Sequence, residues 1–185
     1  MSESTITEKA LALSLKEIMQ TVPLSKVSIR NITSNCSLNR QTFYYHFKDK
    51  FDLVNWIYHT EVTECIANYK HYDNWTDGMY RSLCYLMENK SFYINALNTP
   101  GQNAFDGYFF EFSCELIMGV VNDVSLGMNI PDLYKNFIAD FYTHAFVGVI
   151  VQWIKTGMKD SPQIMAEKIE NVVEGSMVGV LAKYK

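Results

Sequence analysis

The pattern of apolar positions along the chain is helical from one end to the other. Apolar residues recur three and four apart in the long segments, and no segment alternates apolar and polar residues as a half-buried strand would. The first stripe consists of Ile6, Ala10, Leu13 and Ile18. Thr5, followed three residues later by Glu8, predicts a capping box at its start, and Val22-Pro23 predicts its end. We therefore expect an all-α fold.

Breaks in the apolar pattern divide the remainder of the chain into further helices. Asp49 is expected to cap a long helix, with Asp52 favourably placed against the dipole of its first turn. Later breaks fall at Asp73-Asn74, Thr99-Pro100-Gly101, Asn129-Ile130-Pro131-Asp132 and Gly157 to Pro162. Pro131 and Pro162 both stand where a first helical turn tolerates proline. No repeat or low-complexity tract interrupts the series.

The segment from Ser28 to Phe47 is expected to form two short helices with a tight break over residues 35–38. Ser28 and Asn39 can each cap one of these helices, since their side chains accept a bond from a free backbone N–H. Phe43 shares the inner face of the second helix with Phe47. The outer and leading surface of that helix consists of Arg40, Gln41, Thr42, Tyr44, Tyr45 and His46. Such a surface, with donors, a cation and almost no acid, suits a DNA major groove flanked by phosphates.

The same segment resembles the helix-turn-helix of the TetR family of transcriptional regulators. The motif that ends the family's recognition helix reads here Thr42-Phe43-Tyr44-Tyr45-His46-Phe47, followed by Lys48, Asp49 and Lys50. The resemblance implies a three-helix DNA-binding head over residues 1–48 and a helical effector-binding and dimerisation body over residues 49–185. A connecting helix over residues 49–72 would join the two. Ser37 stands where the family usually has glycine, and a positive φ costs serine more than glycine.

The expected DNA contacts fall into two groups. Phosphate positioning is assigned to Ser28, Tyr44, Tyr45, His46 and Lys50. Base reading is assigned to Asn39, Arg40, Gln41 and Thr42. Arginine matches guanine, glutamine matches adenine, and the threonine methyl matches thymine. Two alternatives stay open: Tyr44 can pack against the head, and His46 can interact with the C-terminal dipole of its own helix.

The charge of the chain is divided unevenly between these parts. The net charge is −4, yet residues 1–50 hold seven Lys and Arg against four Asp and Glu, a net charge of +3. The remaining residues hold nine against sixteen, a net charge of −7. An acidic body would repel double-stranded operator DNA from everything except the head. Ordinary charge scatter is the alternative explanation.

The last two predicted helices suggest a homodimer. Residues 145–154 are apolar nearly all round, which requires cover on more than one side. Glycine costs close to 1 kcal/mol inside a helix, so two glycines four residues apart suggest close helix packing. The expected interface consists of Val149, Trp153, Ile169, Val172, Gly175 and Gly179. The alternative is that both helices fill the core of one subunit, and the family resemblance favours the dimer with two heads on a twofold axis.

Effector recognition is implied by the resemblance, since family members often line a cavity with aromatic side chains of the body. The corresponding candidates here are Tyr85, Phe105, Tyr108, Phe109, Phe112, Glu115, Phe146 and Trp153. Plain core packing is the alternative for the aromatic residues. A small-molecule sensor would hold a closed cavity near Tyr85, Tyr108 and Trp153, whereas control by a protein would leave an exposed apolar patch.

A narrower resemblance concerns the branch of the TetR family that contains regulators of dihydroxyacetone kinase operons. It rests on the fragment Arg40-Gln41-Thr42-Phe43-Tyr44, on Trp75, and on residues 85–93. In that branch the body can be addressed by a protein co-regulator instead of a free small molecule, and activation is possible as well as repression. Both the nature of the effector and the sign of regulation therefore stay open.

The remaining chemistry of the sequence points away from metal, cofactor or enzyme function. The four cysteines have no C-x-x-C pairing and fit a reducing cytoplasm, and there is neither a signal peptide nor a long uninterrupted apolar run. His59, His71 and His144 with Cys65, Cys84 and Cys114 have the ligand chemistry that zinc prefers. His59 and Cys65, six apart, do not share a helical face. No nucleophile elbow, phosphate loop or paired carboxylate indicates an enzyme, so we expect no cofactor, no metal and no membrane partner.

Overall fold

In a computed structural model, residues 3–69, 74–99, 105–173 and 175–184 are described, and they contain helices and no strand. The elements are α1 (Glu3–Ile18), η1 (Leu24–Lys26), α2 (Ile29–Asn35), α3 (Arg40–His46), α4 (Lys50–Ile66), α5 (Trp75–Glu88), α6 (Lys90–Leu97), α7 (Phe105–Val124), α8 (Asp132–Lys155), α9 (Pro162–Val173), α10 (Ser176–Leu181) and η3 (Ala182–Tyr184). The all-α prediction is confirmed. The expected breaks at Asp73 and Pro100-Gly101, and the zinc candidate His71, lie outside the described residues.

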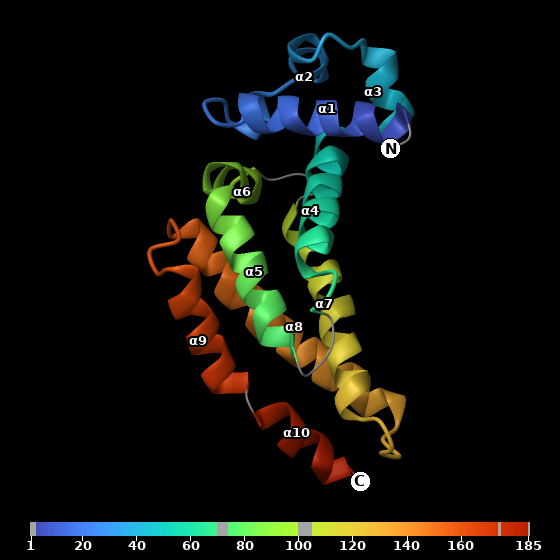
Figure 1. Ribbon diagram of the computed structural model, residues 1–185, viewed down its shortest axis with the longest axis vertical. Coiled ribbons are helices and arrows are strands. Elements are labelled where there is room, and N and C mark those ends of the chain that lie inside the picture. The colour runs from blue at the N-terminus through green and yellow to red at the C-terminus, as the bar shows by residue number, and fades with distance from the viewer. Residues whose placement is uncertain (1–2, 70–73, 100–104, 174, 185) are drawn as a thin grey trace.

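The molecule is elongated, with a head of α1, α2 and α3 at one end (Figure 1). α4 leaves the head and runs along the body, where it packs against α5 and α7. α8 packs on α7, α9 packs on the other side of α5, and α10 is near the far end. One hydrophobic cluster extends from Leu11 and Phe43 in the head to Ile154 and Ile169 in the body. The head and the upper body therefore share a core, with α4 as the helix common to both.

Three of the predicted helix caps are present in the head and at the start of α4. Ser28 forms a capping box with Asn31, and the Asn39 side chain accepts a bond from the Thr42 amide. Asp49 accepts from the amides of the second and third residues after it. The cap predicted at Thr5 is wrong, because α1 already includes Glu3.

The turn between α2 and α3 contains Ser37 in the left-handed region, with φ of 56°. A side chain with a Cβ costs about 1–2 kcal/mol there, whereas glycine adopts this conformation freely. Ser37, which replaces the glycine usual in the family, therefore adopts the left-handed conformation at the cost of local strain.

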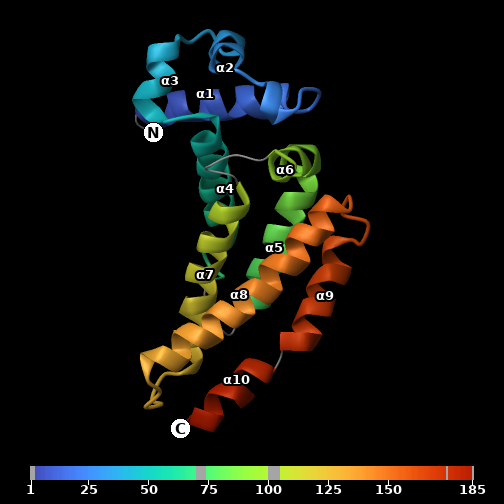
Figure 2. The ribbon, with the colours of Figure 1, turned by 180° about the vertical axis from the view of Figure 1, so that it is seen from behind.

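α8 crosses the body diagonally, from its far end to α6 (Figure 2). By length and composition alone it could cross a membrane, with a mean hydropathy of 1.4 over its most apolar window. It packs along α7 and α6, and 39% of that window is buried inside the subunit. Figure 2 shows α8 and α9 from the side on which they lie nearest to the viewer.

The C-terminal helical run is divided, not continuous as its spacing predicted. α9 ends at Val173, and α10 begins after Gly175, whose φ is 72°. Glycine is therefore required at this position by the backbone conformation. The close packing expected of Gly175 and Gly179 is absent within the subunit, since a Cβ at either position would meet no atom within 4 Å.

Candidate nucleic-acid interface and body cavity

The recognition surface of α3 rests on two buried phenylalanines. Phe43 is fully buried and Phe47 nearly so, and their rings lie 5.8 Å apart. Tyr44 and Tyr45, between them in sequence, are 52% and 83% exposed. Because an amphipathic helix turns its apolar side to the core, the anchoring of Phe43 and Phe47 directs the polar side of α3 outward.

The residues at the start of α3 are exposed but partly engaged in capping. The Asn39 side-chain oxygen accepts from the backbone amide of Thr42 at 2.8 Å and from its hydroxyl at 3.1 Å. Arg40 and Gln41 are exposed, and the Arg40 guanidinium lies 5.9 Å from the centre of the Tyr44 ring. Arg40 and Gln41 are thus the long side chains that extend from the leading end of α3.

Two residues predicted to contact phosphates are held inside the head instead. The ammonium of Lys50 donates to the carbonyl oxygens of Leu24 at 2.6 Å and Val27 at 2.9 Å, and burial lowers its pKa. His46 lies against Glu8 of α1 at 3.3 Å, with its side chain 7% exposed. We therefore reassign Lys50 to anchoring α4, and His46 to the joint between α1 and α3.

Sequence reasoning missed exposed cations close to the helix-turn-helix, namely Lys26, Arg30 and Lys48. Lys26 ends η1 and Arg30 is the second residue of α2, so both lie close to the N-cap Ser28, while Lys48 follows α3. A helical wheel of residues 29–35 would have indicated Arg30, because Ile29 and Ile32 define the opposite, buried side. Lys26 belongs to the three-residue η1 and Lys48 to a connection, and both are too short for periodicity to give a signal.

The head is joined to the body by polar contacts as well as by α4. Lys16 of α1 pairs with Glu61 of α4 at 2.7 Å. The side-chain amide of Asn95 in α6 accepts from the Leu24 amide at 2.7 Å and donates to the Val22 carbonyl at 2.9 Å. Since both atoms of one side-chain amide are used, α6 holds the connection between α1 and α2 in a fixed position.

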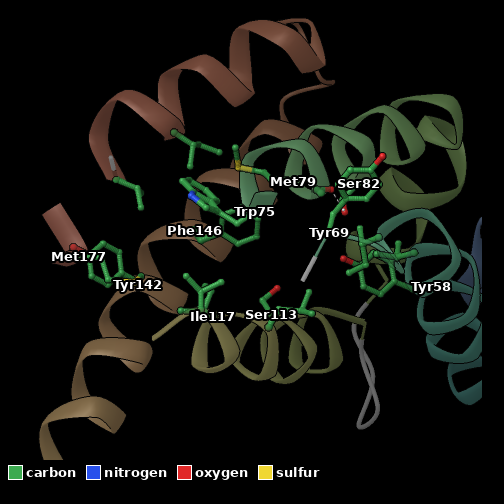
Figure 3. Close-up of a pocket in the computed structure, with 17 residues that line it drawn as sticks. Tyr58, Tyr69, Trp75, Met79, Ser82, Ser113, Ile117, Tyr142, Phe146 and Met177 are labelled. Atoms are coloured by element: carbon green, nitrogen blue, oxygen red, sulfur yellow. Dashed lines mark hydrogen bonds between the residues drawn. The ribbon is translucent and has the colours of Figure 1, made fainter. Parts of the chain in front are cut away.

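A cavity of about 130 Å³ lies in the body between α4, α5, α7, α8 and the C-terminal helices. Its walls are mostly apolar and aromatic, and the residues labelled in Figure 3 include Tyr58, Trp75, Met79, Ser113, Phe146 and Met177. Met177 belongs to α10 and closes one end of the cavity. The Tyr142 hydroxyl is hydrogen-bonded to Ser176 at 2.8 Å, which fixes α10 against α8.

Of the residues predicted to line an effector cavity, Phe146 lines this one and the others lie elsewhere. Five of them, namely Tyr85, Phe105, Phe109, Phe112 and Trp153, are buried in the core. Tyr108 is hydrogen-bonded to His59 at 2.8 Å, and Glu115 is exposed. The expected position of the cavity is corrected accordingly. Phe105, Phe109 and Phe112 pack edge-on around Tyr58, so side chains fill the region in which the cavity was expected.

The predicted dimer residues also separate into two groups. Val149, Val172, Gly175 and Gly179 are exposed on the subunit. Trp153 is buried and donates from its indole to the carbonyl of Asp160, and Ile169 is buried and lines the cavity. Both are therefore reassigned to the core of the subunit.

The outer face of α8 shows an apolar stripe that the sequence prediction did not include. Phe137 and Phe141 are 66% and 62% exposed, and Ala145 and Gly148 follow on the same side of the helix. A Cβ at Gly148 would meet no atom within 4 Å. Large apolar groups beside small ones form a surface that another helix can approach closely.

Metal binding has no geometric support in the part of the chain that the structure describes. No three His, Cys, Asp or Glu side chains gather there as a metal ion would require, and Cys36, Cys65, Cys84 and Cys114 are free thiols.

The class of protein follows from comparison with known families. A TetR-family profile described as "Transcriptional regulator C-terminal region" matches residues 73–175, more than half of the chain. Together with the helix-turn-helix head, this match identifies the chain as a member of the TetR family of transcriptional regulators.

The chain is similar to a particular member of that family. It is 33% identical over 93 residues to the HTH-type dhaKLM operon transcriptional activator DhaS of Lactococcus lactis subsp. lactis (strain IL1403). That alignment covers 50% of each chain, so it spans about half the length of this curated relative. The resemblance to regulators of dihydroxyacetone kinase operons is thereby confirmed.

Solved structures extend the similarity to the full fold. A structure described as dihydroxyacetone kinase operon activator DhaS has a TM-score of 0.71 and 26% identity, with 97% of both chains covered. Two structures of NalD, the secondary repressor of the MexAB-OprM multidrug efflux pump in Pseudomonas aeruginosa, have TM-scores of 0.58 and 0.60. Their identities are 17% and 14%, with 92% of this chain and 95% of theirs covered, so this likeness concerns the fold alone. These relatives are transcriptional regulators, not enzymes.

Proposed function

We propose that the chain is a DNA-binding transcriptional regulator of the cytoplasm that places α3 in the major groove of operator DNA. The observation that carries the proposal is that Arg40, Gln41 and Tyr45 are exposed on the short helix α3. The buried side chains of Phe43 and Phe47 fix the orientation of this helix. Short recognition helices of helix-turn-helix proteins read base edges with the residues at their N-terminal end.

The surroundings of α3 supply the phosphate contacts in this proposal. Three exposed cations lie close to α3 in sequence: Lys26 at the end of η1, Arg30 in α2 and Lys48 after α3. Tyr44 and Tyr45 are exposed on α3 itself. Arg40 and Gln41 carry the base reading, since their side chains match guanine and adenine in the major groove. Thr42 donates two hydrogen bonds to the side-chain oxygen of the N-cap Asn39, which fixes the start of α3. These bonds use the oxygen of the Asn39 side chain, so its amide nitrogen can donate to DNA.

We further propose that the regulator is a homodimer formed through α8 and α9. Phe137 and Phe141 on α8, with Val149 toward its end, would be covered by the same surface of a second copy. Ile164 and Val172 extend the apolar surface onto α9. A twofold axis at this face would place two heads on half-sites about one DNA turn, 34–36 Å, or more apart.

The body is the input domain of the proposed regulator, and an effector acting on it would change the positions of the heads. The cavity beside α4 supports a small molecule as that effector, because Tyr58 belongs to the connecting helix and to the cavity wall. The alternative, a protein co-regulator, is supported by Leu126 and Leu133, which are apolar and highly exposed at the far end of the body. Activation is the sign favoured by the described function of the DhaS relatives.

Selection of duplexes from a random pool by the purified chain tests this function. We expect enrichment of an inverted repeat, and we expect Gln41→Ala to relax the preference at one base pair of each half-site. Gln163→Ala, at an exposed glutamine of α9, is the matched control and leaves the enriched sequence unchanged. Enrichment of no common sequence would contradict the proposal.

A further inference from the structure

We propose that the body cavity is a binding site for a small uncharged molecule that is largely apolar and carries one hydroxyl or carbonyl group. A phenol, a short alcohol or a ketone of about six to ten non-hydrogen atoms belongs to this class, because a cavity of similar size holds benzene. The regulatory consequence rests on the function proposed above, whereas binding itself does not.

The lining of the cavity excludes charged and highly polar molecules. Among the residues that the structure describes, none of the 17 that line the cavity is Asp, Glu, Lys, Arg or His. An ion in this cavity would lose its hydration without gaining a partner of opposite charge, and a small polyol would leave most of its hydroxyls unbonded. The volume of about 130 Å³ suits a molecule of about six to ten non-hydrogen atoms.

The hydroxyls of two buried residues that face the cavity supply its polar contacts. Ser113 of α7 and Tyr58 of α4 are 3% exposed each, and Figure 3 shows both oxygens pointing toward the cavity. In the part of the chain that the structure describes, neither hydroxyl has a hydrogen-bond partner, whereas those of Ser82 and Tyr142 are already bonded. Burial raises the pKa of Tyr58 far above its ordinary value, so its hydroxyl stays protonated and can donate. Each hydroxyl can therefore form a hydrogen bond with a ligand in the cavity.

The same tyrosine connects the cavity with the head. The Tyr58 ring contacts the edge of Tyr93 in α6, with 5.8 Å between centroids. Two residues further along α6, Asn95 holds the Leu24 amide and the carbonyls of Met19 and Val22. A ligand that displaces the Tyr58 ring therefore acts on α4 directly and, through Tyr93, on the helix that holds the connection between α1 and α2.

Methyl NMR of the full chain labelled at methionine tests binding without DNA. Phenol and toluene at millimolar concentration should shift the methyl signals of Met79 and Met177, which line the cavity, and leave that of Met128, at the α7–α8 connection, in place. Benzoate and dihydroxyacetone at the same concentration should shift neither signal. Equal binding of benzoate, or no shift of Met79 and Met177 with phenol or toluene, would overturn the proposal.

Substitutions then test the polar contact. We expect Ser113→Ala combined with Tyr58→Phe to weaken phenol binding about tenfold and to leave toluene binding unchanged. Ser125→Ala is the control, because Ser125 is buried and bonded to the Asn122 carbonyl but does not line the cavity. Equal loss of phenol and toluene binding in the double variant, with the control unaffected, would contradict the assigned contact.

The connection to the head is measured separately. In a chain that binds DNA, phenol should change the DNA affinity of the wild type, and Asn95→Asp should reduce that change while the Met79 and Met177 shifts persist. An unaltered phenol effect in Asn95→Asp overturns the proposed connection. If phenol shifts the methyl signals but the chain does not bind DNA, only the proposed function is contradicted. If the chain binds DNA but phenol shifts neither signal, only the cavity site is contradicted.

Discussion

The ammonium of Lys50 donates to the carbonyl oxygen of Leu24 at 2.6 Å, which links the first residue of α4 to η1 in the head. The carbonyls of Ser25 and Val27 lie within reach of the same ammonium, at 3.3 and 2.9 Å. A lysine that follows the recognition helix in sequence is thereby a structural anchor. The contact makes the position of the head on α4 depend on one cation.

The first prediction concerns this anchor. Lys50→Met should lower the free energy of unfolding by about 2–3 kcal/mol, because it leaves several carbonyls near η1 without their charged donor. Lys48→Met is the matched control at an exposed lysine and should change stability by less than about 0.5 kcal/mol. Urea unfolding measures both. If Lys50→Met is as stable as the wild type and its DNA binding is less sensitive to salt, Lys50 contacts DNA phosphates and is not an anchor.

The second prediction concerns the strained turn. Ser37→Gly should raise the free energy of unfolding by about 0.5–1 kcal/mol, since glycine adopts the observed φ of 56° without a Cβ penalty. Ser34→Gly, in the last turn of α2, should instead lower it by about 0.5 kcal/mol. Thermal unfolding of the wild type and the two variants measures both changes in the free energy of unfolding. A destabilised Ser37→Gly variant would show that the hydroxyl or Cβ contributes more than the strain removes.

The third prediction separates base reading from phosphate contact. Arg40→Ala should cost about 1–3 kcal/mol of binding at the preferred duplex and less at duplexes altered at its base pair. Lys48→Ala should weaken all duplexes alike and reduce the slope of log affinity against log salt by about 1. Fluorescence anisotropy over a salt series measures both quantities. Lys159→Ala, in the connection after α8, is the control, and a uniform loss in Arg40→Ala would remove it from base reading.

The fourth prediction concerns oligomeric state. Phe141→Asp should convert the dimer into a monomer, because a charge would enter the centre of the apolar stripe of α8. Leu126→Asp, at an exposed apolar residue outside that stripe, should leave the dimer intact. Sedimentation velocity distinguishes the two. A wild-type monomer, or dissociation by Leu126→Asp alone, would contradict an α8–α9 interface.

The parts of the head that were predicted correctly depend on short sequence separations. The Ser28, Asn39 and Asp49 caps and the inward direction of Phe43 and Phe47 follow from residues within one or two turns of each other. Helical spacing and the preferences of capping side chains are sufficient for such features.

The parts that were not predicted depend on which elements meet in space. The sequence places Lys50 among the DNA contacts because its position gives no indication that Leu24 of η1, 26 residues earlier, lies beside it. Aromatic spacing indicated that Phe105 and Phe109 are buried, but it cannot tell which buried side chains border unfilled space. Gly175 was read as a packing position because spacing alone does not distinguish a helical glycine from one at a break.

Hydroxyl-radical footprinting on the DNA that flanks the chain's own gene is the most direct test of the central claim, that α3 reads DNA as one of a symmetric pair. We expect two protected segments related by an inverted repeat, about one helical turn or more apart, and their disappearance in Arg40→Ala. A flanking sequence that shows no protection at low salt, or protection that persists unchanged in Arg40→Ala, would contradict it.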